Sequence, residues 1–136
     1  MRQRVLAYVT RGRDGGKELL VFEHRDHPSA GTQVPAGRAE HGESLEDCLR
    51  RELREEAGLE RFRVVREVPV LGDWVAGSRY ENHAFEISAE QQIADSFEHI
   101  VVGDGDDAGL VFLYRWVAIE PGLALWDGAD STYTQL

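Results

Sequence analysis

The sequence predicts one domain of the α/β or α+β class, and three observations support that class. The chain has 136 residues, of which 42% are hydrophobic and 29% are charged, a size and composition typical of one globular domain. Several short strand-like runs flank one amphipathic helical segment. No internal repeat, linker or low-complexity segment interrupts them. Mixed strands packed around one helix favour a layered α/β or α+β fold over residues 1–136.

Two strands are predicted near the start of the chain. Residues 5–10 (VLAYVT) and 18–23 (ELLVFE) are rich in aliphatic and aromatic side chains, and the glycine-containing segment between them predicts a turn. Residues 24–32 are typical of a loop, since they include proline and glycine. Residues 33–35 (QVP) predict a short extended piece before the helix.

One helix is predicted between two boundary residues. Ser44 is expected to be its N-cap or an early-turn residue, and Gly58 is expected to end it. Cys48 falls on the apolar side of this helix and is expected to be a small core residue.

The second half of the chain predicts two further pairs of strands. Residues 61–71 and 79–88 alternate in polarity and are joined through GDWVAGS. Residues 98–102 and 109–119 predict a hairpin across GDGDDAG. The tail is broken by proline, glycine and aspartate, so only one or two helical turns are expected there.

Charge and cysteine content exclude several classes of protein. The formal net charge of −10 disfavours partners that need a positive surface, namely nucleic acid polymers and anionic membranes. Cys48 is the only cysteine, so no intramolecular disulfide can form and a reducing cytoplasm is the expected location. No apolar run resembles a secretory signal or a membrane span. We expect a soluble monomer or homodimer.

The predicted helix carries an unusual group of glutamates near its C-terminal end. Its apolar stripe consists of Leu45, Cys48, Leu49, Leu53 and Ala57. Glu52 and Glu56 project into the middle of that stripe, and Glu55 lies at its edge. Carboxylates repel one another at this spacing and are unfavourable at the negative end of a helix, so a bound cation is the expected compensation. The alternative is a surface helix with many salt bridges, such as that between Arg51 and Glu55.

This helix and the loop before it resemble the Nudix signature. The matching residues are Gly37, Glu43 and the run Arg51-Glu52-Leu53-Arg54-Glu55-Glu56-Ala57-Gly58-Leu59. Every fixed position of the signature is present. The resemblance implies an α/β/α sandwich with a mixed sheet. Because the family usually ends in a second sizeable helix and this tail is broken, a reduced second helical layer is left open.

The resemblance also implies a metal site. Glu52, Glu55 and Glu56 would hold Mg²⁺ or Mn²⁺, with the carbonyl of Gly37 as a further ligand. Arg51 would orient the carboxylates. Glu43 would pair with Arg51 or reach an outer-shell water.

The general base is left open at this stage. Glu52 or Glu55 could accept the proton of the attacking water, whereas many family members use a carboxylate from a later loop. The candidates in the second half of the chain are Glu98, Asp104, Asp106 and Asp107. Glu98 is the first choice because it begins a predicted strand.

Candidate substrate contacts come from outside the signature. Trp74, Arg79 and Tyr80 follow the helix in positions that often face the nucleoside in the family, where an aromatic ring could stack on a base. The alternative for Trp74 is a half-buried place in the sheet. Arg25 is a candidate for phosphate contact or for simple decoration of a strand.

The predicted function is that of a metal-dependent pyrophosphohydrolase. Its substrate would be a nucleoside diphosphate linked to another moiety, such as a nucleoside triphosphate or a related small nucleotide. The alternatives are a Nudix-fold module that senses or binds a nucleotide without turnover, and an acidic interaction domain whose helix contacts a basic partner.

Overall fold

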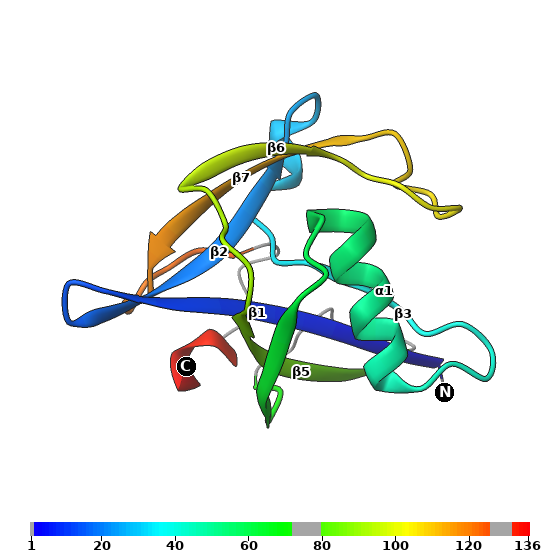
Figure 1. The fold of residues 1–136 in the computed structure, drawn as a ribbon, viewed down its shortest axis with the longest axis horizontal. Coiled ribbons are helices and arrows are strands. Elements are labelled where there is room, and N and C mark those ends of the chain that lie inside the picture. The colour runs from blue at the N-terminus through cyan, green and yellow to red at the C-terminus, as the bar shows by residue number, and fades with distance from the viewer. Residues whose placement is uncertain (1, 72–79, 126–131) are drawn as a thin grey trace.

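The computed structural model describes residues 2–71, 80–125 and 132–136, and its elements form one mixed sheet with a long helix against it (Figure 1). The strands are β1 (Arg2–Arg13), β2 (Gly16–His24), β3 (Ala36–Arg38), β4 (Phe62–Val68), β5 (Tyr80–Ala89), β6 (Ser96–Ile100) and β7 (Val111–Ala118). The helices are α1 (Leu45–Ala57) and the short 3₁₀ turns η1 (Pro28–Ala30) and η2 (Thr132–Gln135). This architecture confirms the predicted α+β class.

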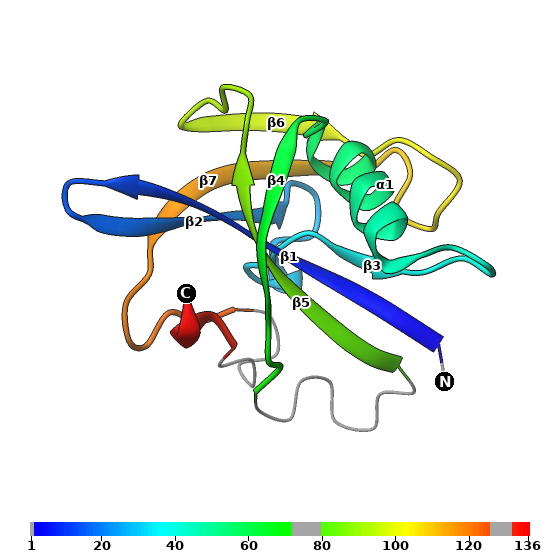
Figure 2. The same ribbon diagram turned by 60° about the horizontal axis from the view of Figure 1, so that its bottom comes forward.

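The sheet is built around β1. The strand order is β4-β5-β1-β2-β7-β6, and β3 pairs with β1 outside that path. β1 runs parallel to β5, while the other pairings are antiparallel. One edge of β1 is shared, because Arg4–Leu6 pair with β3 and Thr10–Arg13 pair with β2. Figure 2 shows β1 passing between β5 on one side and β2 and β3 on the other. The shared edge brings β3, and with it Gly37, beside the helix.

The predicted strands are present but differ in extent. β1 and β2 extend beyond residues 5–10 and 18–23 at both ends, because pairing partners stabilise polar residues that have no strand pattern of their own. The short extended piece predicted at 33–35 makes a single bridge from Gln33 to Phe22, and the strand itself follows at β3. The hairpin of β6 and β7 is confirmed.

Helix α1 begins and ends where its local sequence predicts. The hydroxyl of Ser44 accepts a hydrogen bond from the amide of Asp47 at 3.1 Å, which caps the first turn. Gly58 has φ +67°, a left-handed conformation in which its amide donates back to the carbonyl of Arg54 at 3.1 Å. Cys48 is fully buried, as predicted. None of the helices in the described residues has the length and apolarity that a membrane crossing requires.

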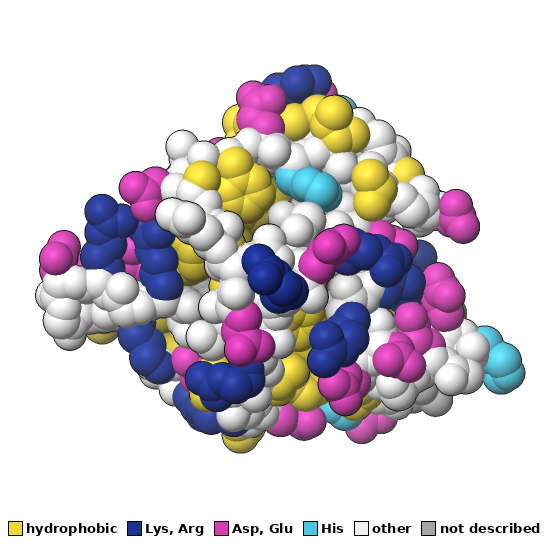
Figure 3. Space-filling view, viewed as in Figure 1, with side chains coloured by type: hydrophobic (Ala, Val, Ile, Leu, Met, Phe, Trp, Pro, Cys, Tyr) yellow, Lys and Arg dark blue, Asp and Glu magenta, His cyan; other side chains and the backbone are white. Residues whose placement is uncertain are grey.

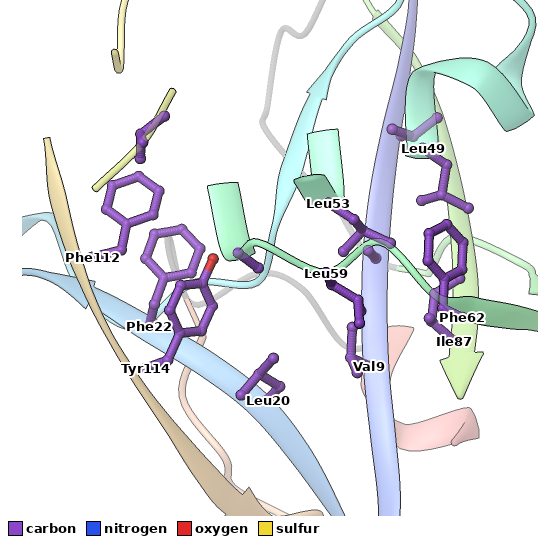
Figure 4. Close-up of a cluster of buried hydrophobic side chains, with 14 of the residues drawn as sticks. Val9, Leu20, Phe22, Leu49, Leu53, Leu59, Phe62, Ile87, Phe112 and Tyr114 are labelled. Carbon is purple, nitrogen blue, oxygen red and sulfur yellow. The ribbon is translucent and has the colours of Figure 1, made fainter. Parts of the chain in front are cut away.

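Hydrophobic residues cover both faces of the sheet. Alternate residues of β1 point to opposite sides, so Val9 belongs to the cluster under α1 while Tyr8 belongs to the cluster on the other face. Figure 4 shows the first cluster, in which Leu53 of α1 and Leu59 after it lie beside β1 near Val9. Aromatic rings of β2 and β7 extend it: Phe22 and Phe112 stack with their centroids 4.0 Å apart, and Tyr114 lies 5.2 Å from Phe22.

The face opposite α1 is covered without a second long helix in the described residues. Tyr133 of η2, Leu125 and Val34 bury this side of the sheet. In both ribbon views η2 lies on the other side of β1 from α1. Within the described ranges the second helical layer is therefore reduced to a 3₁₀ turn.

A buried carboxylate, that of Glu86, links its own strand β5 to three other strands at a place away from α1. Glu86 of β5 is 3% exposed and accepts hydrogen bonds from Thr10 and Lys17, each at 3.0 Å, and from Arg66 at 3.1 Å. Burial raises the pKa of Glu86, but these hydrogen bonds and the charge of Lys17 outweigh burial, so its pKa lies below the ordinary value. The charged form is therefore the one that stabilises the fold.

The stability difference between wild type and Glu86→Gln is expected to depend on pH. Because the folded-state pKa is depressed, the charge of Glu86 stabilises the fold fully above its unfolded-state pKa, and this contribution is lost as the pH falls through the folded-state pKa. Glu86→Gln should lower the unfolding free energy by about 1–2 kcal/mol at pH 7 and by much less at low pH. Urea denaturation across pH measures both, with Glu60→Gln at an exposed position as the control. A difference independent of pH would contradict the stabilising charge.

Candidate metal centre and active site

A cleft opens where β3, the C-terminal half of α1 and the loop between β6 and β7 meet. Its volume is about 370 Å³. The functional side chains and backbone that line it include Gly37, Arg38, Arg51, Glu52, Glu55, Glu56, Asp104, Asp106 and Asp107. Figure 3 shows acidic and basic side chains gathered side by side over α1 and the loop before it. The cleft is thus lined mainly by charged groups drawn from three separate segments.

Arg51 organises the carboxylates at one wall of the cleft. Its guanidinium donates two hydrogen bonds to Glu43, at 2.8 and 3.0 Å, and a third to Glu52 at 2.9 Å. A longer bond of 3.3 Å reaches Glu55, and one of 2.9 Å reaches the carbonyl of Arg38. The hydrogen bonds from Arg51 hold the pKa of Glu43 below its ordinary value. Glu43 was expected either to pair with Arg51 or to reach an outer-shell water. The structure shows the pairing with Arg51.

Glu56 is the most deeply placed acid of the group. It is 6% exposed, and burial raises its pKa well above the ordinary value. A hydrogen bond with Glu52 and the charges of Glu52 and Asp107 raise it further. Two carboxyl groups in contact cannot both be charged without a positive group between or beside them. The site therefore favours either a retained proton or a cation at this place.

Two glycines allow the carboxylates to lie against the backbone. A Cβ added at Gly37 would overlap the carboxylate of Glu52, and one added at Gly103 would lie 2.6 Å from the carboxyl carbon of Glu55. Gly103 also has φ +106°, which side-chain-bearing residues rarely adopt. Burial is the largest cause that raises the pKa of Glu55. Both acids thus occupy space that only glycine leaves free.

These residues fit a hard divalent cation. Glutamate oxygens with a nearby backbone carbonyl are the donor set that Mg²⁺ and Mn²⁺ prefer, together with water and substrate oxygens. The carbonyl oxygen of Gly37 lies close to α1, at 3.9 Å from the sulfur of Cys48. In the part of the chain that the structure describes, no three acids, histidines or cysteines already converge as a finished ligand cage. Arg51 holds Glu52 and Glu55 by hydrogen bonds, and Glu56 shares a hydrogen bond with Glu52.

Basic groups also line the cleft. Arg2 of β1 and Arg38 of β3 are among the lining residues, and Arg38 donates a hydrogen bond to the hydroxyl of Tyr80 at 3.2 Å. That hydrogen bond and the charges of Arg38 and Arg2 hold the pKa of Tyr80 below its ordinary value. Positive groups therefore stand beside the carboxylates, where they suit an anionic ligand.

Several residues singled out from the sequence lie elsewhere. The structure does not bring Glu98 to the cleft: it is exposed on β6, on the strand face opposite that of His99. Arg25 is likewise not among the lining residues and pairs with Asp26 at 3.2 Å. Trp74 and Arg79 lie outside the described residues.

Some residues at the site were not found from the sequence. Gly103 belongs to a segment whose glycines predicted only a turn. Its place against Glu55 depends on how the β6–β7 hairpin packs on α1, for which the sequence carries no local signal. Arg38 follows directly after Gly37 in β3, and the sequence carries no local signal that it lines the cleft, since alternation gives Gly37 and Arg38 opposite faces.

Gly37→Ala is expected to weaken cation binding without unfolding the protein. The new Cβ would displace the carboxylate of Glu52, which is the mobile end of a flexible side chain, so the fold absorbs the change. We expect the affinity for Mn²⁺ to fall about tenfold, as when a group that orients a metal ligand is lost, with the unfolding free energy changed by less than about 1 kcal/mol. Calorimetric titration with Mn²⁺ measures the first and urea denaturation the second.

Gly105→Ala provides the matched control for this variant. Gly105 lines the same cleft, but a Cβ there would meet nothing within 4 Å. Equal Mn²⁺ affinity of Gly37→Ala and wild type would show that the close approach of Gly37 to Glu52 does not shape the site.

Comparison with known proteins identifies the family of the chain. The NUDIX domain family model matches residues 1–131. The mixed-sheet fold is that of Nudix hydrolases, which act on phosphorus-containing anhydrides. The chain belongs to the Nudix family, which confirms the resemblance seen in residues 37–59. No curated protein matches the chain.

Three solved structures share the fold. An Ap4A hydrolase binary complex from C. elegans has a TM-score of 0.58 at 15% identity, covering 88% of this chain and 81% of that one. A NUDIX hydrolase from Nitrosomonas europaea has a TM-score of 0.52 at 22% identity, covering 86% and 70%. A putative NUDIX hydrolase from Listeria monocytogenes has a TM-score of 0.55 at 16% identity, covering 98% and 90%. At these identities the likeness concerns the fold alone.

Proposed function

We propose that residues 1–136 form one catalytic domain, a Mg²⁺- or Mn²⁺-dependent pyrophosphohydrolase. Its substrate is a nucleoside diphosphate linked to another moiety. The observation that carries this proposal is the placement of Glu52, Glu55 and Glu56 on one side of a single cleft, with Glu56 buried. Three acids on the inward side of a helix, one of them buried against another, need a positive partner.

In this proposal Glu52, Glu55 and Glu56 hold the divalent ions, with the carbonyl of Gly37 as a further ligand. The ions supply charge neutralisation at the phosphate oxygens and a lower pKa for the attacking water. Arg51 keeps the carboxylates of Glu52 and Glu55 in place through its hydrogen bonds, and Glu43 fixes Arg51 from the other side.

The proton of the attacking water needs an acceptor at the cleft. Glu52 and Glu55 remain candidates from the helix. Asp104, Asp106 and Asp107 are the candidates from the β6–β7 loop, because they line the cleft whereas Glu98 does not. We propose the loop aspartates in place of Glu98 for this role. The charge of Asp107 is near enough to Glu56 to raise the pKa of that buried acid.

Arg38, Arg2 and Tyr80 are proposed to bind the part of the substrate beyond the cleaved bond. Guanidinium groups suit phosphate oxygens, and the Tyr80 hydroxyl already lies within hydrogen-bond distance of Arg38. The C. elegans neighbour is named an Ap4A hydrolase, so dinucleoside polyphosphates are one candidate class of substrate. We further expect the protein to act in the cytoplasm as a monomer or homodimer.

Product release from a panel of nucleotides tests the proposal. The panel contains common and oxidised nucleoside triphosphates, dinucleoside polyphosphates, ADP-ribose, NADH, coenzyme A and sugar nucleotides, each with Mg²⁺, with Mn²⁺ and with a chelator. We expect cation-dependent release of a nucleoside monophosphate from at least one class.

Thermal denaturation with and without the cation separates the alternatives. A rise in melting temperature with Mn²⁺ but no turnover would favour a nucleotide-sensing module, because a ligand that binds only the folded state stabilises it by mass action. No turnover and no thermal response would contradict the metal site itself.

A further inference from the structure

The last turn of α1 is held by the β6–β7 hairpin. The last four carbonyls of a helix have no partner within the helix and must find one elsewhere. In α1 two of these carbonyls belong to Glu55 and Glu56, the residues whose side chains line the cleft. Both accept hydrogen bonds from β6, β7 or the residues that follow β6.

The carbonyl of Glu55 accepts two of these bonds. The ring nitrogen Nε2 of His99 lies 2.8 Å from it, and the amide of Val102 lies 3.1 Å from it. Because a carbonyl oxygen can only accept, the imidazole must carry its hydrogen on Nε2. One side chain and one backbone amide of the β6–β7 hairpin thus fix this peptide group.

The carbonyl of Glu56 accepts one bond from a buried side chain. The hydroxyl of Tyr114 donates to it at 2.7 Å. The ring of Tyr114 is 2% exposed and stacks on Phe97 with centroids 4.8 Å apart and 9° between the planes. Phe22 packs on it at 5.2 Å. The ring has little freedom, so its hydroxyl is a fixed point for the helix end.

The same hairpin also meets the helix end by close contact. The ring of His99 lies 3.3 Å from the place that a Cβ on Gly58 would occupy, directly after α1. Gly103, which follows β6 in the same hairpin, lies against the carboxylate of Glu55. The backbone and the side chain of Glu55 are therefore both held by residues 99–103.

We propose that His99 and Tyr114 are positioning residues for the metal centre, an inference that rests on the proposed function. By fixing the carbonyls of Glu55 and Glu56, they set the rotation of the last turn of α1 and so the direction in which both carboxylates enter the cleft. Neither residue lines the cleft, so their effect passes through the helix backbone.

Titration with Mn²⁺ alone, without nucleotide, tests the role of Tyr114. Tyr114→Phe keeps the ring and its packing and removes only the donor to Glu56. We expect its Mn²⁺ affinity to fall about tenfold, the low end of the range for groups that orient metal ligands. Tyr8→Phe is the matched control, because Tyr8 is equally buried but lies in the cluster on the opposite face of the sheet. It should lose stability without losing Mn²⁺ affinity.

A pair of His99 variants gives an independent test. His99→Leu removes the donor to Glu55 and should weaken Mn²⁺ binding, whereas His99→Gln offers a side-chain amide as a donor and should restore part of it. His99 is only partly buried, so both variants should fold. A purely structural role would lower stability in both without changing the affinity for Mn²⁺.

The outcomes separate this inference from the proposed function. Wild-type affinity for Mn²⁺ in both Tyr114→Phe and His99→Leu would overturn the positioning role while leaving the metal centre intact. Absence of Mn²⁺ binding by the wild type would contradict the proposed function, and the positioning role with it.

Discussion

Glu56→Gln is expected to abolish cation-dependent turnover while leaving the fold as stable as the wild type or slightly more stable. Glutamine keeps the shape of the side chain but cannot carry the charge that a cation needs. We expect kcat/KM to fall by more than about a hundredfold, beyond the 10- to 100-fold cost of losing an outer-shell partner. Without a cation, burial already favours the uncharged form of Glu56, so the neutral amide costs the fold little.

Two measurements check this expectation. The first is kcat/KM with Mg²⁺ and with Mn²⁺ on the best substrate of the panel. The second is the melting temperature with and without Mn²⁺, which should rise in the wild type and stay constant in Glu56→Gln.

Glu46→Gln is the matched control on the same helix. Glu46 is exposed and pairs with Arg50 at 3.1 Å on the solvent side, so its loss should leave turnover unchanged. Marked unfolding of Glu56→Gln without a cation would indicate instead that the negative charge of Glu56 stabilises the fold through a structural ion pair.

Leu53→Ala is expected to give a large loss of stability. Leu53 is fully buried between the helix and the sheet, in the cluster shown in Figure 4. Truncation of such a leucine costs about 3–5 kcal/mol, from lost burial and from the cavity that remains. Because a small domain has only about 5–15 kcal/mol in total, the variant should melt at a clearly lower temperature. Mn²⁺ should recover part of the loss, because a ligand that binds only the folded state stabilises it by mass action.

Urea denaturation of Leu53→Ala and Leu113→Ala measures this loss. Leu113 is 36% exposed on β7, so its truncation should cost less than about 1 kcal/mol. Equal losses from the two substitutions would mean that α1 does not pack on the sheet as tightly as the buried cluster indicates.

Local features made much of the fold predictable. The boundaries of α1 follow from Ser44 and Gly58, because capping and the left-handed terminus depend on residues next to the helix. The β6–β7 hairpin follows from alternation around a glycine-rich segment. Strand ends were less predictable, since the polar ends of β1 are strands only because β2, β3 and β5 pair with them.

The sequence by itself determined the family and the group of helix acids, because the signature is contiguous and helical periodicity places Glu52 and Glu56 on the inward side. Only the tertiary structure decided which distant residues meet that helix. Glu98 and His99 are neighbours in β6, yet His99 reaches the end of α1 whereas Glu98 faces solvent. Alternation along a strand gives adjacent side chains opposite faces, and the packing of the hairpin on α1 decides which face meets the helix.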